Sequence, residues 1–350
     1  MPVAVSLIWE VSPLAAPGLA VSAVSGTVAH GAIVTVSGAL FGSKPVAAPV
    51  KYDDFQNLSV GQDLNANGWV TAGYYPPVAS NANLRSGTPF TRNAHSRFES
   101  GPFQYAHDVS NFRLVGLNAS RYYVDAWHYF HVDADPQPQN IKPIRFHQND
   151  AGAPNAYLNF YTPDTSDSLA CGRDGVSLAD GAWFGNSPTG SLPSGAWYDH
   201  WIHVQYLIDA GSGNNAFDGS CVVYINGALR YDHRNIATIG SGFYTWPEVY
   251  LGNYVRTDPH GGAHAYWESV YVDRSWARVE IGDAPVYNAC THREVQVPVA
   301  WSDTSISVQL NRGSFPSFSA LYLFVVDAQN NTSPGFRLGP TSPANLRIIR

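Results

Sequence analysis

The sequence is short of charge, of lysine and of methionine. Only 13% of its residues are charged, against about 25% in an average soluble domain. Lysine occurs at positions 44, 51 and 142, methionine at position 1, and the formal net charge is −7. No run of Lys or Arg is present, so we expect no nucleic acid bound by a basic face. No stretch of about 18 apolar residues occurs either, and the sequence therefore predicts no membrane span.

Cysteine is also scarce, and the sequence offers little for a metal. Cys171, Cys221 and Cys290 are odd in number and too far apart for a metal knuckle, so one disulfide or three buried free thiols both remain open. His260 and His264 could clasp a metal in a loop, but no carboxylate at motif spacing accompanies them. We predict no metal and no cofactor. A structural calcium ion is the alternative, with three loose candidate ligands: Asp53, Asp54 and Asp273.

A secretory signal is lacking at the N-terminus. The first basic residue is Lys44, Glu10 interrupts the apolar stretch, and Pro13 and Pro17 follow, which makes a poor signal peptide. The composition nevertheless suits an outward-facing protein that meets glycans. A virion protein reconciles both facts because it reaches the outside by assembly. We therefore expect a location on the virion surface, with an extracellular, secreted protein as the alternative.

Turn residues and β-forming residues are abundant. The chain has 31 Gly and 24 Pro, together with 20 Tyr and 10 Trp. Such residues are typical of short strands joined by turns, and no convincing amphipathic helix of three turns is found. The sequence predicts an all-β protein, and its 350 residues suffice for two domains.

The clearest pattern runs from Trp197 to Asp232. Residues 202–208 alternate with the period of a strand that has one buried face, and residues 222–225 do the same. Asn226-Gly227 then favours a tight hairpin turn. The stretch is predicted to be strand, polar loop, strand, turn and strand.

This Trp-led strand and the Tyr-Ile-Asn-Gly-Ala-Leu hairpin resemble the laminin G-like and concanavalin A-like jelly rolls. Lys51-Tyr-Asp-Asp-Phe and Gly68-Trp-Val resemble the start of such domains, and residues 277–283 resemble their closing strands. The resemblance implies a jelly roll over residues 48–289. Lectins, glycan-binding modules and several polysaccharide lyases share that fold.

Two flanking segments resemble the halves of an IPT/TIG immunoglobulin-like domain, as in phage and bacterial surface proteins. Residues 18–47 end in the Ser-Gly…Phe-Gly pattern of its second strand, and residues 290–340 carry the closing strands. Each half alone has too few strands to bury a core. We therefore expect a split Ig-like sandwich that carries the jelly roll as an insertion. Residues 1–17 form an N-terminal arm or strand, and residues 341–350 form a tail.

A candidate glycan site lies on two predicted facing strands, 143–148 and 157–161. Alternation puts one set of polar and aromatic side chains on one face, opposite Ile144, Phe146, Leu158 and Phe160. That set consists of Arg145, His147, Tyr157, Asn159 and Tyr161. Tyrosine rings stack on sugars while polar groups bind hydroxyls. The same set would suit a polysaccharide lyase, with Arg and Asn neutralising a uronate and Tyr or His moving protons. An ordinary solvated sheet face is the third interpretation.

Departures from family motifs count against the lyase. Alginate-lyase-like jelly rolls carry Arg-x-Glu-x-Arg, Gln-Ile-His and Tyr-x-Lys-x-Gly strands. Here Arg97-Phe98-Glu99 lacks the second Arg, Ile202-His203 lacks the Gln, and no Tyr-x-Lys strand exists. We therefore expect a non-enzymatic surface protein: a phage virion decoration or fibre-type component with an outward-facing, glycan-binding jelly roll. The alternatives are a lyase that cleaves an anionic glycan by β-elimination and a secreted bacterial adhesin. Expected partners are other virion or surface proteins, cell-surface polysaccharide and, as an open alternative, copies of the same chain.

Overall fold

The computed structural model describes residues 18–73, 75–98, 106–107, 110–133, 140–147, 156–161, 168–173, 182–186, 199–256 and 262–339. Within these ranges the chain is all-β, with two short 3-10 helices at Leu64–Asn67 and Tyr287–Ala289. The predicted fold class, all-β and built from sandwiches, is confirmed. No helix in these ranges is long and apolar enough to cross a membrane. The predicted arm (1–17) and tail (341–350) lie outside the described residues.

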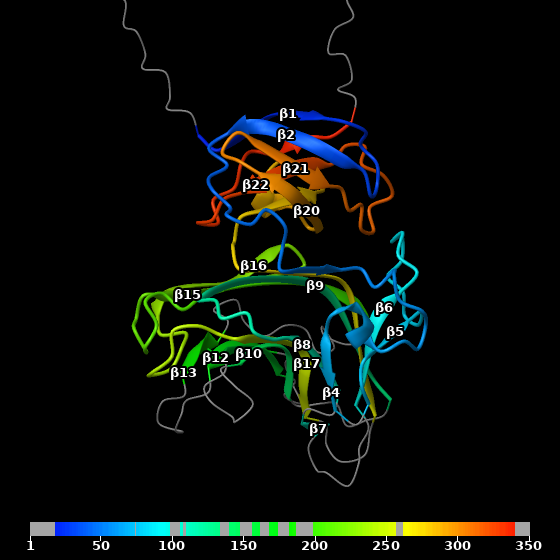
Figure 1. Ribbon diagram of the computed structural model, residues 1–350, viewed down its shortest axis with the longest axis vertical. Coiled ribbons are helices and arrows are strands. Elements are labelled where there is room, and N and C mark those ends of the chain that lie inside the picture. The colour runs from blue at the N-terminus through cyan, green and yellow to red at the C-terminus, as the bar shows by residue number, and fades with distance from the viewer. Residues whose placement is uncertain are drawn as a thin grey trace, which may run out of the picture.

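Two eight-stranded sheets form the larger, lower part of the molecule (Figure 1). The middle sheet has the order β16 (Ala228–Ile236), β15 (Gly219–Ile225), β14 (Trp201–Asp209), β9 (Arg121–Val132), β18 (Ala263–Asp273), β6 (Asn93–Phe98) and β5 (Val78–Ser80), and β3 (Lys51–Asp53) pairs with β18. The lower sheet has the order β13 (Ala182–Asn186), β12 (Ser168–Arg173), β11 (Ala156–Tyr161), β10 (Asn140–His147), β17 (Glu248–Arg256), β8 (Asn111–Leu114) and β4 (Val70–Ala72), and β7 (Ala106–His107) pairs with β17.

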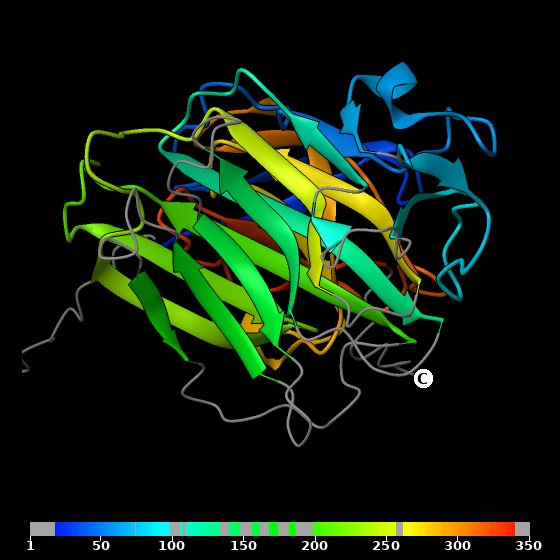
Figure 2. The same cartoon turned by 90° about the horizontal axis from the view of Figure 1, so that it is seen from below.

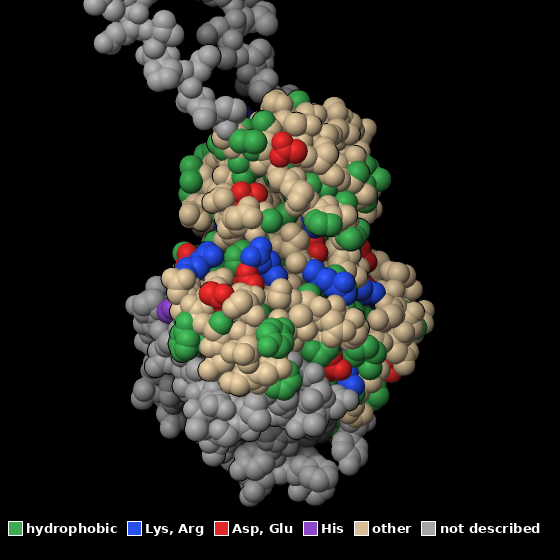
Figure 3. All heavy atoms as spheres, turned by 60° about the vertical axis from the view of Figure 1, so that its left-hand side comes forward, with side chains coloured by type: hydrophobic (Ala, Val, Ile, Leu, Met, Phe, Trp, Pro, Cys, Tyr) green, Lys and Arg blue, Asp and Glu red, His purple; other side chains and the backbone are tan. Residues whose placement is uncertain are grey.

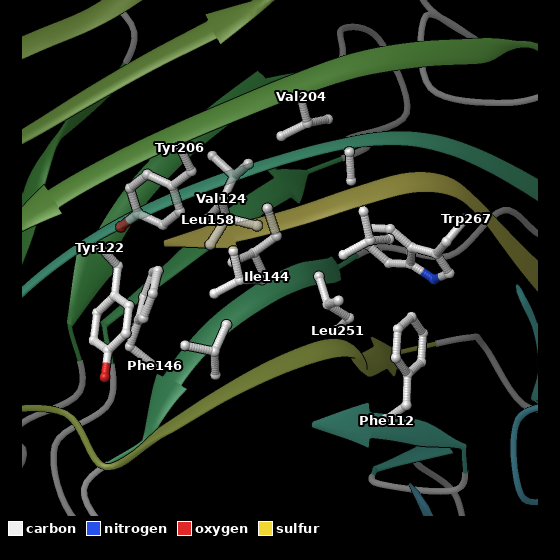
Figure 4. Packing of buried hydrophobic residues seen from close by; sticks show 14 of the residues in the cluster. Phe112, Tyr122, Val124, Ile144, Phe146, Leu158, Val204, Tyr206, Leu251 and Trp267 are labelled. Atoms are coloured by element: carbon white, nitrogen blue, oxygen red, sulfur yellow. The ribbon is translucent and has the colours of Figure 1, made fainter. Parts of the chain in front are cut away.

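Apolar residues from both sheets meet in the core of this sandwich (Figure 4). Val124 and Val204 of the middle sheet are fully buried, as are Ile144, Leu158 and Leu251 of the lower sheet. Because side chains alternate along a strand, burying these residues directs their neighbours to the outer faces of the two sheets. The expected inward position of Ile144 and Phe146 is confirmed.

The upper part is one seven-stranded sheet that folds over its own core. Its order is β1 (Ala20–Ser25), β2 (Ile33–Ala39), β21 (Ser305–Gln309), β20 (Arg293–Trp301), β19 (Arg278–Gly282), β22 (Tyr322–Val326) and β23 (Phe336–Arg337). The first half of β20 pairs with β19 and its second half with β21. Residues from the beginning and the end of the chain therefore share one core, in which β2 and β21 contribute Val34, Val36, Ile306 and Val308.

The hairpin expected around Asn226-Gly227 is confirmed. β15 pairs with β16 through Ile225 and Ala228, and both turn residues have positive φ, 49° and 78°, as a two-residue type I′ turn requires. One strand assignment was wrong: residues 278–282 do not close the jelly roll. They form β19, which pairs with β20 and β22 of the upper sheet. The apolar alternation of Val279 and Ile281 is the same for either sheet, so it could not decide between them.

A network of buried charges joins the upper sheet to the outer face of the middle sheet. Glu280 accepts hydrogen bonds from Arg278, Arg293 and Tyr287, and Arg293 also donates to Gln205 of β14. Although burial raises the pKa of Glu280, the two guanidinium groups lower it to about 2. Arg293 thereby links the buried carboxylate of Glu280 to Gln205 on this face of the middle sheet.

Candidate functional site

The candidate site lies on the outer face of the lower sheet, which Figure 2 shows from below. The predicted pairing of the strands around Arg145 and Tyr157 is confirmed, because β10 and β11 are antiparallel and these two residues are opposite each other. On its other side Arg145 is opposite Tyr250 of β17, and Tyr250 is opposite Arg113 of β8. Four neighbouring strands thus place Tyr157, Arg145, Tyr250 and Arg113 in one row.

Tyr250 is at the centre of the contacts on this face. Arg113 Nη1 donates a hydrogen bond to the Tyr250 hydroxyl at 2.6 Å, and its guanidinium lies 4.9 Å from the centre of the Tyr250 ring. The ring of His147 stacks on the ring of Tyr250, with 3.9 Å between their centres. Tyr250 therefore has a cation at its hydroxyl and an imidazole stacked on its ring.

Cations gather on the same face. Arg113 and Arg145 flank Tyr250, and the Lys142 ammonium lies 4.1 Å from the centre of the Tyr157 ring. A cation held over an aromatic ring gains about 0.5–2 kcal/mol, most where water is excluded. Arg145 is only 9% exposed, so its charge acts in surroundings where electrostatic interactions are stronger than in bulk water. The face combines positive charge with tyrosine rings in a protein whose overall charge is negative.

A bulge shapes the strands that hold these residues. Lys142 is opposite Tyr254 and Ile144 is opposite Leu251, so two residues of β17 face Pro143 alone. Proline donates no ladder hydrogen bond and is tolerated at such an irregularity. Gly252 supplies the left-handed backbone, with φ of 66°, that one type of bulge requires. The bulge separates Lys142 from the regular run that carries Arg145 and His147.

The structure brings together three of the five residues predicted for the glycan site. Arg145, His147 and Tyr157 lie on the described outer face. Asn159 and Tyr161 lie on β11, opposite Ala170 and Ser168 of β12, but their side chains are outside the described structure. Sequence reasoning missed Arg113 and Tyr250. Both lie in alternating strands, but no local signal says that β17 pairs with β10 or that β8 pairs with β17.

Two fragments of lyase motifs lie on the other sheet. Arg97 is on β6 and His203 is on β14. His203 is buried, stacks on Trp127 and is hydrogen-bonded to Asp125. These two residues therefore do not converge with Arg145 and Tyr250, which lie on the lower sheet.

The acidic candidates for calcium are engaged in other contacts. Asp53 accepts hydrogen bonds from Trp69 Nε1 and Asn67 Nδ2, both at 2.7 Å, and Asp273 forms an ion pair with Lys44 at 2.6 Å. His264 contacts His95 and Asp133, whereas His260 lies outside the described residues. Across the described ranges, no group of three or more His, Cys, Asp or Glu side chains is arranged to hold a metal ion. All three cysteines are buried and free.

Comparisons with known proteins give similarities of fold only. No protein-family model matches the chain, and no curated protein matches it. Among solved structures, the alginate lyase Aly36B is 14% identical, with 65% of this chain and 97% of that chain covered and a TM-score of 0.47. The cellulose-induced protein Cip1 is 15% identical, with 64% and 97% covered and a TM-score of 0.42. The alginate lyase vAL-1 from Chlorella virus is 12% identical, with 62% and 99% covered and a TM-score of 0.41. Such low identities and TM-scores carry no information on function.

Proposed function

We propose that the outer face of the lower sheet binds an anionic polysaccharide. The observation that carries the proposal is the row Tyr157–Arg145–Tyr250–Arg113 on four adjacent strands. Strands lie about 4.8 Å apart, so the row extends about 14 Å, a length that suits a polymer better than a single sugar. Tyr157 and Tyr250 are buried beside Lys142 and Arg113 and hold these cations in place, and the guanidinium groups can pair with carboxylates in a bidentate manner.

The test is the affinity for a soluble uronate polymer, polygalacturonate, compared with neutral dextran of similar length. We expect binding of the uronate polymer that weakens with salt and weaker or no binding of dextran. Arg145→Gln is expected to weaken uronate binding about tenfold or more, since a hydrogen bond to a charged group contributes about 1.5–3 kcal/mol. Arg234→Gln is the matched control because Arg234 is an exposed arginine on β16 of the other sheet. Equal affinity of wild type, Arg145→Gln and Arg234→Gln for the uronate polymer would contradict the proposal.

A second candidate function is β-elimination by a polysaccharide lyase, and the contacts of Tyr250 favour it. In that reaction a cation offsets the uronate carboxylate, a base removes the C5 proton, and an acid protonates the leaving oxygen. Arg113 or Arg145 could pair with the carboxylate, while the Tyr250 hydroxyl and His147 could handle the protons. Formation of the unsaturated product is measured by ultraviolet absorbance. Tyr250→Phe should remove that signal and retain binding; binding by wild type without any such absorbance would leave a non-enzymatic glycan-binding protein.

We also propose, from the sequence, where the protein is located and to which family the upper sheet belongs. The low charge, the Ig-like segments and the incomplete lyase motifs favour a surface component of a phage virion, with a secreted adhesin as the alternative. Co-sedimentation with assembled particles in fixed stoichiometry is the test, and free soluble protein alone would count against it.

The IPT/TIG-like patterns favour a split Ig-like domain, and the pairing of β2 with β21 supports that proposal.

A further inference from the structure

The chain crosses between the upper and lower parts twice, and a hollow lies between the two crossings. The first crossing runs from β2 to β3 and the second from β18 to β19 (Figure 1). A pocket of about 450 Å³ is lined by residues of both crossings: Lys44, Pro45, Val46, Ala48, Pro49 and Val50 from the first, and Asp273, Arg274 and Ser275 from the second. It shares no residue with the candidate glycan site.

The wall from the first crossing is apolar. Pro45, Val46, Ala48, Pro49 and Val50 present only carbon side chains, and Val46 is 71% exposed. Two prolines restrict the backbone of this wall, so it loses little conformational entropy when a ligand binds. Small-molecule sites are typically concave, mostly apolar, about 300–1,000 Å³ in volume, and frequent at domain interfaces. The hollow has each of these properties.

The buried charges at the pocket are already paired. The side chain of Lys44 is fully buried, its ammonium lies 2.6 Å from an Asp273 oxygen, and it donates to the Tyr271 hydroxyl at 3.2 Å. Burial lowers the pKa of Lys44 and raises that of Asp273, each against the attraction of the other. Neither group has charge to spare for a ligand.

Arg274 is different. Its side chain is exposed. Its backbone N–H donates to the Asp273 carboxylate, but its guanidinium forms no hydrogen bond or ion pair with the described residues. The pocket therefore has an apolar wall and one unpaired cation. Figure 3 shows Lys and Arg side chains gathered at the waist between the two parts of the molecule, the region in which the crossings lie.

We propose that this pocket binds a small organic monoanion: a carboxylate that pairs with Arg274 and an apolar body that lies against Pro45, Val46 and Pro49. Residues of both crossings line the pocket, so an occupant contacts both connections between the upper and lower parts. Binding is expected to slow hydrogen exchange of the backbone amides in both crossings. This site is independent of the proposed polysaccharide site.

The probe is 3-phenylpropanoate, with its neutral amide as the matched ligand, and the readout is saturation-transfer NMR titration of the full chain. We expect saturable binding of the acid with Kd of about 1 mM and about three- to fivefold weaker binding of the amide, in line with an exposed ion pair. Arg274→Gln should reduce the affinity for the acid to that for the amide. Ala48→Trp places an indole in the pocket and should remove binding of both ligands.

The control variant is Arg234→Gln, an exposed arginine that does not line the pocket, and it should bind the acid as wild type does. Thermal unfolding checks that each variant is folded; if Ala48→Trp is not, Val46→Trp on the exposed rim replaces it. No saturation by the acid up to about 10 mM, or equal affinity of acid and amide, would overturn the proposal. Unchanged binding in both Arg274→Gln and the tryptophan variant would place the ligand elsewhere and overturn it as well.

Discussion

The outer faces of the middle and lower sheets carry similar residues but have different surroundings. On the middle sheet, Tyr123, Asp125 and Gln205 point outward and are covered by the upper sheet, with their polar atoms hydrogen-bonded to one another and to Arg293. On the lower sheet, Arg113, Arg145 and Tyr250 point outward, and the upper sheet lies on the opposite side of the sandwich (Figure 1). The same alternation of residues thus yields a domain interface on one sheet and a candidate binding face on the other.

A polar outer face acquires its role from the element that covers it. Burying charges between two sheets is costly unless each is paired and hydrogen-bonded. The upper sheet meets this requirement over the middle sheet with Glu280, Arg278 and Arg293. A face that binds an anionic ligand must present cations that the upper sheet does not cover. Substitutions on the two faces should therefore affect different quantities: stability on the middle sheet and binding on the lower one.

The largest effect on stability is expected from Glu280→Ala. This change leaves Arg278 and Arg293, both fully buried, without their carboxylate. Removing one partner of a buried ionic network costs about 3–5 kcal/mol, and urea denaturation measures the loss in the free energy of unfolding. Asp232→Ala, at an exposed ion pair, is the control. A loss below about 1 kcal/mol would mean that this network does not hold the two parts together.

A pH-dependent effect is expected from Glu268 at the same interface. Arg85 bridges Glu268 and Glu294, and burial raises the pKa of Glu268 to about 7 even though Arg85 lowers it. Between pH 4.5 and 7 the folded state therefore binds more protons than the unfolded state at this site, so its contribution to stability falls as pH rises, by up to about 3 kcal/mol.

The comparison with Glu268→Gln isolates this contribution. His95 and His128 titrate in the opposite sense, because burial lowers their pKa values to about 4 and about 3, and this slope is common to both proteins. Relative to the variant, wild type should lose stability between pH 5 and pH 7.5 in denaturation experiments. Parallel pH profiles would show that Glu268 does not titrate in this range.

A smaller effect on stability is expected from Tyr250→Phe on the lower sheet. The change removes the hydrogen bond from Arg113 and retains the stacking with His147, so the free energy of unfolding should fall by about 0.5–1.5 kcal/mol. Thermal or urea unfolding measures this change. A loss as large as that of Glu280→Ala would show that the lower face is also a structural network, and the distinction between the two faces would fail.

The smallest effect is expected from Arg234→Ala. Arg234 contacts Asp232 two residues away, and both side chains are 44% exposed. Exposed ion pairs contribute about 0–1 kcal/mol, so the free energy of unfolding should change by no more than about 0.5 kcal/mol. A larger loss in urea denaturation would indicate that the stacking of Arg234 over Trp276 stabilises the folded protein.

Local patterns in the sequence predicted the strands well and the neighbours of each strand poorly. Alternation predicted β14 and β15, and Asn226-Gly227 located a turn, because both signals depend only on nearby residues. β19 belongs to the upper sheet because it pairs with β20 on one side and, on the other, with Phe324 and Val325 of β22, more than 40 positions away along the chain. No period within the strand carries that information.

The same limit applies to the candidate site. Arg145 and Tyr157 were predicted together because their strands are joined in sequence, whereas Tyr250 lies about a hundred positions further on. Its role at the centre of the site follows from the pairing of β17 with β10. The covering of His203 by the upper sheet was likewise invisible, since an exposed strand face and an interface face have the same residue pattern.

The most direct test of the proposed function is a calorimetric titration of polygalacturonate into wild type and two charge-matched double variants. Arg113→Gln/Arg145→Gln changes the lower face, and Arg234→Gln/Arg337→Gln changes exposed arginines elsewhere. Each pair takes the formal net charge from −7 to −9, because each Gln removes one positive charge. We predict that the first pair loses binding about tenfold or more while the second binds as wild type does at the same salt concentration. Equal weakening by both pairs would show that overall charge, and not the row of residues around Tyr250, determines binding.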